Sequence, residues 1–205
     1  MSDSRIFVEG GGGGKDSKEL QSRCREAFHK LLENAGFKGR IPRIVACGGR
    51  RDAFDRFETA MNTGKYDLVL LIVDSEDPVD DAEQPWKHLK ARQADGWEKP
   101  ASATDDQVFL MTTCMETWCV ADRTVLKEHY GSRLQGSALP PLTQLEYRDR
   151  HGVQDALRHA TRGCINKYEK NERSFALLAE VNPATLQTHL PAFARMIRIL
   201  KEKLP

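Results

Sequence analysis

The segment from Tyr66 to Val73 constrains the fold most, because six of its residues read Leu-Val-Leu-Leu-Ile-Val without a polar side chain. A strand with one face in water alternates apolar and polar residues, whereas a strand covered on both faces is apolar throughout. The run ends in Asp74-Ser75-Glu76-Asp77, a polar sequence typical of a turn. We therefore expect a central strand in a sheet that carries helices on both faces.

Strand-like and helix-like segments alternate along the first part of the chain. Short apolar runs bounded by glycine predict strands, and apolar residues spaced three or four apart predict amphipathic helices. Such alternation is typical of parallel βαβ units, so we expect an α/β fold with a parallel sheet flanked by helices. The expected strands are residues 5–9, 43–47, 66–73 and 107–113, and the expected helices are residues 15–35, 54–64 and, as one or two helices, 114–130.

The pattern divides the chain into two parts. Residues 1–131 hold all the expected strands. Residues 75–106 within them read as an inserted excursion that is polar, contains Pro78, Pro85 and Pro100, and has a short helix expected at 86–91. Residues 132–205 contain only helical patterns, at 153–162, 173–180 and 191–204. We expect a catalytic α/β domain followed by a helical C-terminal cover or small lobe.

Composition excludes several classes of protein. Lys plus Arg number 31 against 30 for Asp plus Glu, so nucleic acid could be bound only through local basic patches. The five cysteines include no C-x-x-C pair, which argues against a disulfide framework and a zinc ribbon, and no H-E-x-x-H motif supports a zinc hydrolase. No apolar run approaches the ~18 residues of a membrane span, and we expect a soluble cytoplasmic protein.

A run of glycines, Gly10 to Gly14, precedes Lys15 between a strand and a helix, which is the setting of a phosphate-binding loop. The spacing differs from the G-x-x-x-x-G-K-[ST] motif, because Glu9 stands at its first glycine and Asp16 at its Ser/Thr position. A flexible turn with exposed amides and a turn that contacts phosphate both remain open.

Carboxylates follow two of the expected strands. Glu9 lies between the first strand and Gly10, and Asp74, Glu76 and Asp77 follow the central strand. Each could be an ordinary helix-entry or turn residue. Parallel strands end at the same edge of a sheet, however, and four carboxylates meeting there would repel one another unless a cation held them. Mg²⁺ prefers carboxylate oxygens, so we expect an acidic metal site.

The order of these motifs resembles the Toprim domain of topoisomerases, bacterial primases and overcoming-lysogenization (OLD) nucleases. Val8-Glu9-Gly10 precedes a helix, Cys47-Gly48-Gly49 closes the next strand, and Asp74-x-Glu76 closes the third. The family pattern has Asp-x-Asp after the third strand, so the second acid differs here. The resemblance implies metal-dependent phosphodiester cleavage of DNA or RNA, including tRNA.

Longer strings are similar to an uncharacterised bacterial family of Toprim-like proteins related to OLD nucleases. The strings are Val73-Asp74-Ser75-Glu76-Asp77-Pro78, Thr104-Asp105-Asp106-Gln107, Met115-Glu116-Thr117-Trp118-Cys119-Val120-Ala121-Asp122, Lys170 and Ser174-Phe175. Members of that family are often encoded beside an AAA or SMC-like ATPase. The resemblance thus implies an effector nuclease of an ATPase-containing antiviral defence system.

Site residues follow from the resemblance. It implies that Glu9 and Asp74 are the principal ligands of Mg²⁺ or Mn²⁺, with Glu76 or Asp77 completing the shell of two ions about 4 Å apart. Glu116 would add another acid.

Two of these assignments have competitors. Glu116 has the spacing of a capping box with Thr113. A basic residue near the scissile phosphate would be Lys170, with Lys167 as a rival, although both stand in a charged stretch that could simply face solvent.

Backbone phosphates could be contacted by Arg50 and Arg51, at the turn after the second strand, and by Lys15. Two other functions remain open. One is a non-catalytic Toprim-like subunit that binds nucleic acid or an ATPase partner. The other is a nucleotide-binding α/β protein that uses the glycine run.

Overall fold

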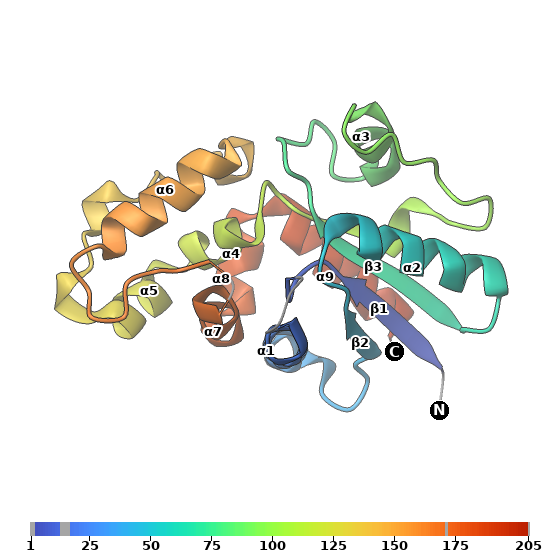
Figure 1. Ribbon diagram of the computed structural model, residues 1–205, viewed down its shortest axis with the longest axis horizontal. Coiled ribbons are helices and arrows are strands. Elements are labelled where there is room, and N and C mark those ends of the chain that lie inside the picture. The colour runs from blue at the N-terminus through green and yellow to red at the C-terminus, as the bar shows by residue number, and fades with distance from the viewer. Residues whose placement is uncertain (1–2, 13–16, 171, 205) are drawn as a thin grey trace.

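A computed structural model describes residues 3–12, 17–170 and 172–204 (Figure 1). Four parallel strands form one sheet in the order β2-β1-β3-β4. Their bounds are Ser4–Val8 for β1, Arg43–Ala46 for β2, Leu68–Asp74 for β3 and Val108–Met111 for β4. Helices flank this sheet and make up the C-terminal part of the chain, which confirms the expected α/β class.

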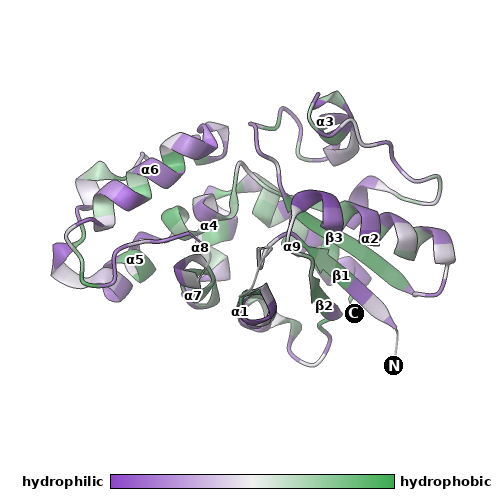
Figure 2. Ribbon diagram, viewed as in Figure 1, coloured by the Kyte–Doolittle hydropathy of each residue, from purple (hydrophilic) through white to green (hydrophobic). Residues whose placement is uncertain are grey.

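Successive residues of each strand point into two different cores. On β3, Leu70 and Ile72 belong to the larger core on one face, whereas Leu71 and Val73 belong to the smaller core on the other. Burial of apolar surface is worth about 25 cal/mol per Å², and this strand gains it on both sides. The continuous apolarity of β3 follows from that double cover, and its ribbon is correspondingly green in Figure 2.

The helices form a layer on each face of the sheet. Helices α2 and α3 cover one face, and α1, α4 and α9 contribute to the core on the other. The bounds are Ser17–Leu32 for α1, Arg50–Thr63 for α2, Pro85–Ala91 for α3, Met115–Ala121 for α4, Arg123–Tyr130 for α5, Arg150–Thr161 for α6, Glu172–Glu180 for α7, Pro183–His189 for α8 and Pro191–Lys203 for α9. Within the described residues, no helix is long and apolar enough to cross a membrane.

Most expected helices are found close to their expected positions, and one was missed. Helix α8 starts with Asn182 as its cap and Pro183 in its first turn, a helix-start signal that was present in the sequence. The segment expected as one or two helices after β4 forms two, because Asp122 ends α4 and its carboxylate accepts a hydrogen bond from Val125 N at 3.1 Å, capping α5.

Helices from the end of the chain pack against its beginning. Helix α7 lies along α1, and α9 lies against β4 (Figure 1). Arg195 of α9 is buried and donates to the carbonyl oxygens of Val108 at 3.1 Å and Asp105 at 2.9 Å. Leu177, Phe193 and other C-terminal residues share one core with strand residues such as Ile6. The C-terminal helices therefore complete the cover of the sheet.

A tight turn follows β1 and brings α1 close to the sheet edge. Gly10 and Gly48 exchange backbone hydrogen bonds of 2.9 and 2.8 Å, and Gly10 has a φ of 141°. A Cβ at Gly10 would lie 2.9 Å from the sulfur of Cys24 and 3.2 Å from the ring of Phe175. Backbone conformation and close packing both require glycine here.

Gly10→Ala is expected to lower the free energy of unfolding by about 1–3 kcal/mol, because the added methyl group overpacks the turn and strains its backbone. Urea denaturation measures the change. Gly163→Ala is the matched control, since a Cβ there meets no atom within 4 Å. Equal stability of the two variants would contradict this description of the turn.

Glu146 supplies a buried acid that holds the start of α9. Its carboxylate accepts hydrogen bonds from Ala192 N at 3.1 and 3.2 Å. Burial raises the pKa of Glu146 from its ordinary 4.5 to about 7, although the backbone N–H groups of Ala192 and Phe193 act in the opposite direction. Its proton is therefore held more tightly in the folded than in the unfolded chain.

This raised pKa predicts a pH-dependent contribution to stability. The contribution is complete below pH 4.5 and is lost as the pH rises through about 7, because the unfolded chain ionises first. Relative to Glu146→Gln, which stays neutral, the wild type should lose up to about 3 kcal/mol across that window. Urea denaturation of both proteins at several pH values measures the difference, and parallel pH profiles would contradict it.

Candidate metal centre

Three carboxylates meet at the carboxyl edge of the sheet. Glu9 follows β1, Asp74 is the last residue of β3, and Glu76 stands two residues further on. One oxygen from each lies within 4.8 Å of the others, and all three residues are half-buried. The parallel sheet thus brings together acids that are 65 residues apart in the chain, and this group could bind a metal ion.

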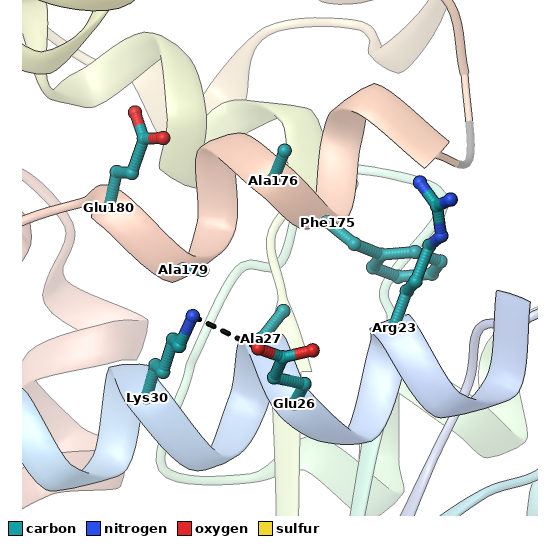
Figure 3. Close-up of a pocket in the computed structure, with 8 residues that line it drawn as sticks. All are labelled: Arg23, Glu26, Ala27, Lys30, Phe175, Ala176, Ala179 and Glu180. Carbon is teal, nitrogen blue, oxygen red and sulfur yellow. Dashed lines mark ion pairs between the residues drawn. The ribbon is translucent and has the colours of Figure 1, made fainter.

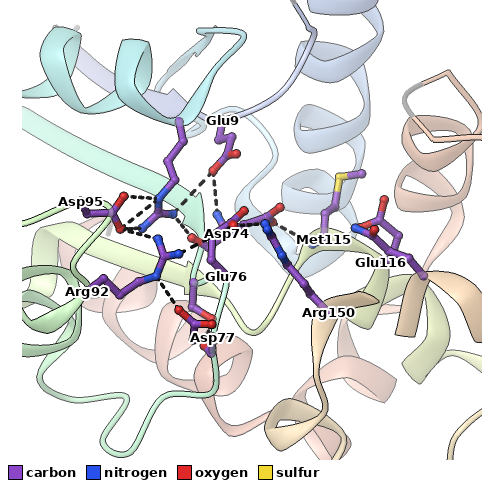
Figure 4. Close-up of polar contacts among 12 residues, drawn as sticks. Glu9, Asp74, Glu76, Asp77, Arg92, Asp95, Met115, Glu116 and Arg150 are labelled. Carbon is purple, nitrogen blue, oxygen red and sulfur yellow. Dashed lines mark hydrogen bonds and ion pairs between the residues drawn. The ribbon is translucent and has the colours of Figure 1, made fainter. Parts of the chain in front are cut away.

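Backbone hydrogen bonds fix two of these acids. Glu9 N donates to the carbonyl of Ile72 at 2.9 Å, which extends the pairing of β1 with β3 by one residue. Asp74 N donates to Glu9 Oε2 at 3.1 Å, and Asp74 Oδ1 accepts from Met115 N at 2.8 Å (Figure 4). The two carboxylates are therefore oriented by the sheet edge and by the start of α4.

Glu76 is held in an unusual backbone conformation. Its φ is 69°, in the left-handed region, which costs a residue with a side chain about 1–2 kcal/mol. Its N–H donates to the carbonyl of Thr113 at 2.8 Å, so the segment after β4 holds the turn in place. This conformation directs Glu76 into the group of three. The sequence offered Glu76 and Asp77 equally, and the left-handed backbone could not be predicted from residue type.

Arg50 lies beside Glu9 and Asp74 at the sheet edge. Its guanidinium binds both oxygens of Asp95, with contacts of 2.7 to 3.2 Å, and stacks 4.6 Å from the centre of the Trp97 ring. It also donates to the carbonyl of Asp74 and lies 3.7 Å from Glu9 Oε2. Arg50 thus joins the sheet edge to the 75–106 excursion.

Two further arginines neutralise the outer side of the group. Arg150 of α6 forms an ion pair with Glu76. Arg92 contacts Asp77 and Asp95 at 2.7 Å and Glu76 at 3.9 Å (Figure 4). With Asp77 and Asp95 included, the carboxylates of this cluster outnumber its guanidinium groups, and negative charge remains on the side of Glu9 and Asp74.

The buried acids hold their protons more tightly than exposed ones. Burial raises the pKa of Asp74 well above its ordinary value, and the charges of Glu9 and Glu116 add to the effect, while Lys170 opposes it. Burial also raises the pKa of Glu9, against the effects of Arg50 and of the Asp74 N–H. A cation at these oxygens would favour the ionised carboxylates and so oppose both shifts.

A small cavity of about 180 Å³ lies beside these two acids. Glu9, Asp74, Glu116 and Lys170 give it charged walls, and glycines 10–12, Met115 and Phe175 are among the other residues that line it. Since a water molecule takes up about 30 Å³ in the liquid, the cavity has room for a hydrated cation or a phosphate group.

Glu116 lies in the wall of this cavity but outside the group of three. Its side chain is buried with 1% exposed and accepts hydrogen bonds from the Tyr168 hydroxyl and, at 3.2 Å, from Gln154 Nε2. The capping box with Thr113 is not formed, because the Thr113 hydroxyl donates to Arg148 O and Cys114 is the N-cap of α4. Thr104 and Gln107 have the same spacing in the sequence, and they do form a capping box.

The remaining expected site residues are placed as follows. Asp77 lies outside the group of three, with 62% of its side chain exposed. Lys167 and Lys170 are both exposed, but Lys170 lines the cavity and Lys167 does not. Arg51 is exposed and pairs with Asp55 at 2.8 Å. Lys15 and the glycines at 13–14 lie outside the described residues.

Sequence reasoning missed the residues that surround the acids. Arg92 and Arg150 carry counter-charges, Asp95 holds Arg50 and Arg92, and Tyr168 anchors Glu116. They come from the excursion and from the helical C-terminal part. Arg92 lies 15 residues from Asp77, and Asp95 lies 45 residues from Arg50. No local pattern marks such residues, because only the tertiary fold brings them to the site.

A second hollow of about 360 Å³ lies between α1 and α7 (Figure 3), and Phe175 lines both this hollow and the cavity beside the acids. Its walls carry acids and bases together, and Lys30 pairs with Glu26 at 3.0 Å. Ala27, Ala176 and Ala179 also line it. With balanced charge it shows no preference for an anion or a cation.

Fold and site together define an α/β protein with a carboxylate cluster at the carboxyl edge of a parallel sheet. The family model described as "Domain of unknown function (DUF4276)" matches residues 8–201, and the chain belongs to that family. No curated protein and no solved structure matches the chain.

Asp74→Asn should stabilise the protein in the absence of divalent cations. The amide keeps an acceptor for Met115 N but removes a charge that burial and Glu9 make costly, which we expect to be worth about 1–2 kcal/mol at pH 7.5. Thermal unfolding in EDTA measures this effect. The same melts with Mn²⁺ at about 100 times its Kd should stabilise only the wild type, by about 2.7 kcal/mol.

Asp155→Asn is the control for this pair of melts, because Asp155 is exposed on α6 and pairs with Arg158. It should behave as the wild type in both conditions. An Asp74→Asn protein that is destabilised in EDTA, or that gains as much from Mn²⁺ as the wild type, would contradict the assignment of Asp74.

Proposed function

We propose that this protein is a Mg²⁺- or Mn²⁺-dependent phosphodiesterase of Toprim type, related to the OLD nucleases, that cleaves DNA or RNA. The convergence of Glu9, Asp74 and Glu76 at one edge of the sheet is the observation that carries the proposal. The cationic side chain of Lys170 in the wall of the adjoining cavity supports it, since a phosphodiester needs a positive group beside the ligands of a metal ion.

The donor set fits a hard divalent cation. The described group contains carboxylate oxygens and no cysteine or histidine, which is the preference of Mg²⁺ and Mn²⁺ rather than of zinc. One or two such ions, when bound, would supply an activated water and stabilise the charge on a leaving oxygen. The resemblance to Toprim enzymes implies two ions. A second ion would need an oxygen from outside the group of three, and Glu116 lines the same cavity.

The protein's own residues divide the remaining tasks. Glu9 and Asp74 hold the cation in an orientation set by the backbone N–H groups of Asp74 and Met115. Lys170 can bind a phosphate oxygen at the cavity, where its charge partly opposes the rise in the pKa of both acids. Arg50 keeps the sheet edge rigid through its bonds to Asp95 and to the Asp74 carbonyl, so its part is positioning.

One observation favours the alternative, a non-catalytic subunit. Arg150 already pairs with Glu76, and Arg50 lies close to Glu9, so these arginines neutralise part of the acidic charge without a metal ion. In that case the acids would serve structure, and nucleic acid or an ATPase would be a binding partner only. The ATPase partner and a role in antiviral defence stay predictions from the sequence resemblance.

Cleavage assays distinguish the two functions. The purified protein, incubated with DNA, RNA and tRNA, should cleave at least one of them with Mg²⁺ or Mn²⁺ and none in EDTA. Glu9→Gln and Asp74→Asn should each reduce the rate by at least about 100-fold, because each removes a ligand charge. Asp155→Asn should cleave as the wild type does.

Full activity in both acid variants would contradict the proposed site. If the wild type cleaves nothing, calorimetric titration with Mn²⁺ decides between the functions. Binding that is lost in Glu9→Gln and Asp74→Asn supports a metal enzyme that needs a partner. Absence of Mn²⁺ binding by the wild type supports the non-catalytic subunit.

A further inference from the structure

Arg123, at the start of α5, carries a guanidinium that lacks an anionic partner. Its Nη2 donates to the carbonyl of Pro140, whereas Nη1 is buried without a hydrogen-bond partner. Among the described residues no carboxylate forms an ion pair with it, and burial lowers the pKa of Arg123. Arg123 is half-buried, and a guanidinium in such a setting is normally paired with an acid, so this one is available to an anion from outside the chain.

A cavity of about 540 Å³ lies beside this guanidinium, between α5 and residues 131–142. That volume is within the range of about 300–1,000 Å³ that is typical of small-molecule sites. Its other walls are mainly apolar, with Leu134, Leu139 and Leu142 among them. Lys127, one helical turn after Arg123, is a second cation on the same wall, and no described carboxylate pairs with it.

We propose that this cavity binds a small amphipathic anion, in which one carboxylate, sulfonate or phosphate group is joined to an apolar alkyl or aryl body. The anionic group would pair with the Arg123 guanidinium, with Lys127 nearby, and the apolar body would contact the leucines. Two cations in an apolar setting suit a single anionic group and not a polyanion such as nucleic acid.

This site is separate from the candidate metal centre. The two cavities share no lining residue, and neither Glu9 nor Asp74 contributes to the cavity at α5. The proposal therefore holds or fails independently of metal binding and of nuclease activity.

Titration with 8-anilinonaphthalene-1-sulfonate, followed by its fluorescence, tests the proposal on the full chain. The dye carries one sulfonate on an aromatic body, and N-phenyl-1-naphthylamine has the same rings without the charge. We expect saturable binding of one sulfonate dye per chain and competition by decanoate but not by decanol. Arg123→Gln should lower the affinity for the sulfonate dye by about tenfold and leave the affinity for the neutral dye unchanged.

Three further variants complete the experiment. Lys127→Gln should lower the affinity for the sulfonate dye by about two- to fivefold. Arg133→Gln removes an exposed charge nearby that does not line the cavity, and it should change nothing. Gly136→Leu should weaken both dyes by narrowing the cavity, and a Cβ there meets no atom within 4 Å, so the chain should still fold.

Several results would overturn the proposal. One is dye binding that does not saturate. Another is an affinity of Arg123→Gln for the sulfonate dye equal to that of the wild type. A third is an equal loss of affinity in Arg123→Gln and Arg133→Gln. Circular dichroism checks that each variant is folded. If Arg123→Gln does not fold, Lys127→Gln and Gly136→Leu decide, and unchanged binding of the sulfonate dye in both overturns the proposal.

Discussion

Carboxylate charge gathered at the carboxyl edge of the sheet is the constraint on which the surrounding structure depends. Two unit charges about 4.8 Å apart repel by roughly 3–4 kcal/mol at an effective dielectric constant of 20. The protein offsets this cost in two ways. Backbone N–H groups donate to the carboxylates of Glu9 and Asp74, and guanidinium groups from elsewhere in the chain lie beside the acids. Burial, with the charges of Glu9 and Glu116 added, still raises the pKa of Asp74, so its ionised form remains costly.

The segments that provide these counter-charges lie outside the sheet. Arg92 comes from the excursion after β3, together with Asp95, which holds Arg92 and Arg50 in place, and Arg150 comes from α6. Tyr168 and Gln154, also in the C-terminal part, hold Glu116 at the cavity wall. The excursion and the C-terminal helices therefore build the site as well as covering the sheet, and one continuous core joins the sheet to the C-terminal helices.

The sequence predicted the sheet well because strand signals are local. The apolar run of β3 and the short runs of β1, β2 and β4 reflect burial on two faces, and each ends at a residue that breaks the pattern. Placing Glu9 near Asp74 required only the rule that parallel strands end at one edge. The fold class and the location of the site were thus accessible from pattern alone.

Other features depend on contacts between distant residues and could not be read from the pattern. Glu76 joins the group of three because its backbone turns into the left-handed region, whereas Asp77 points to Arg92. Arg50, expected as a phosphate contact, is largely engaged with Asp95, which lies 45 residues away. Glu116 could be assigned to a capping box or to the site, and only the position of Tyr168 shows where its carboxylate bonds.

Anomalous diffraction from crystals soaked in Mn²⁺ tests the central claim most directly. We expect a peak among the carboxylates of Glu9, Asp74 and Glu76, at about 2.1–2.3 Å from their oxygens, with the Arg150 guanidinium displaced from Glu76. An empty acidic edge, with Arg50 and Arg150 still bound to the acids while Mn²⁺ occupies other sites, would contradict it.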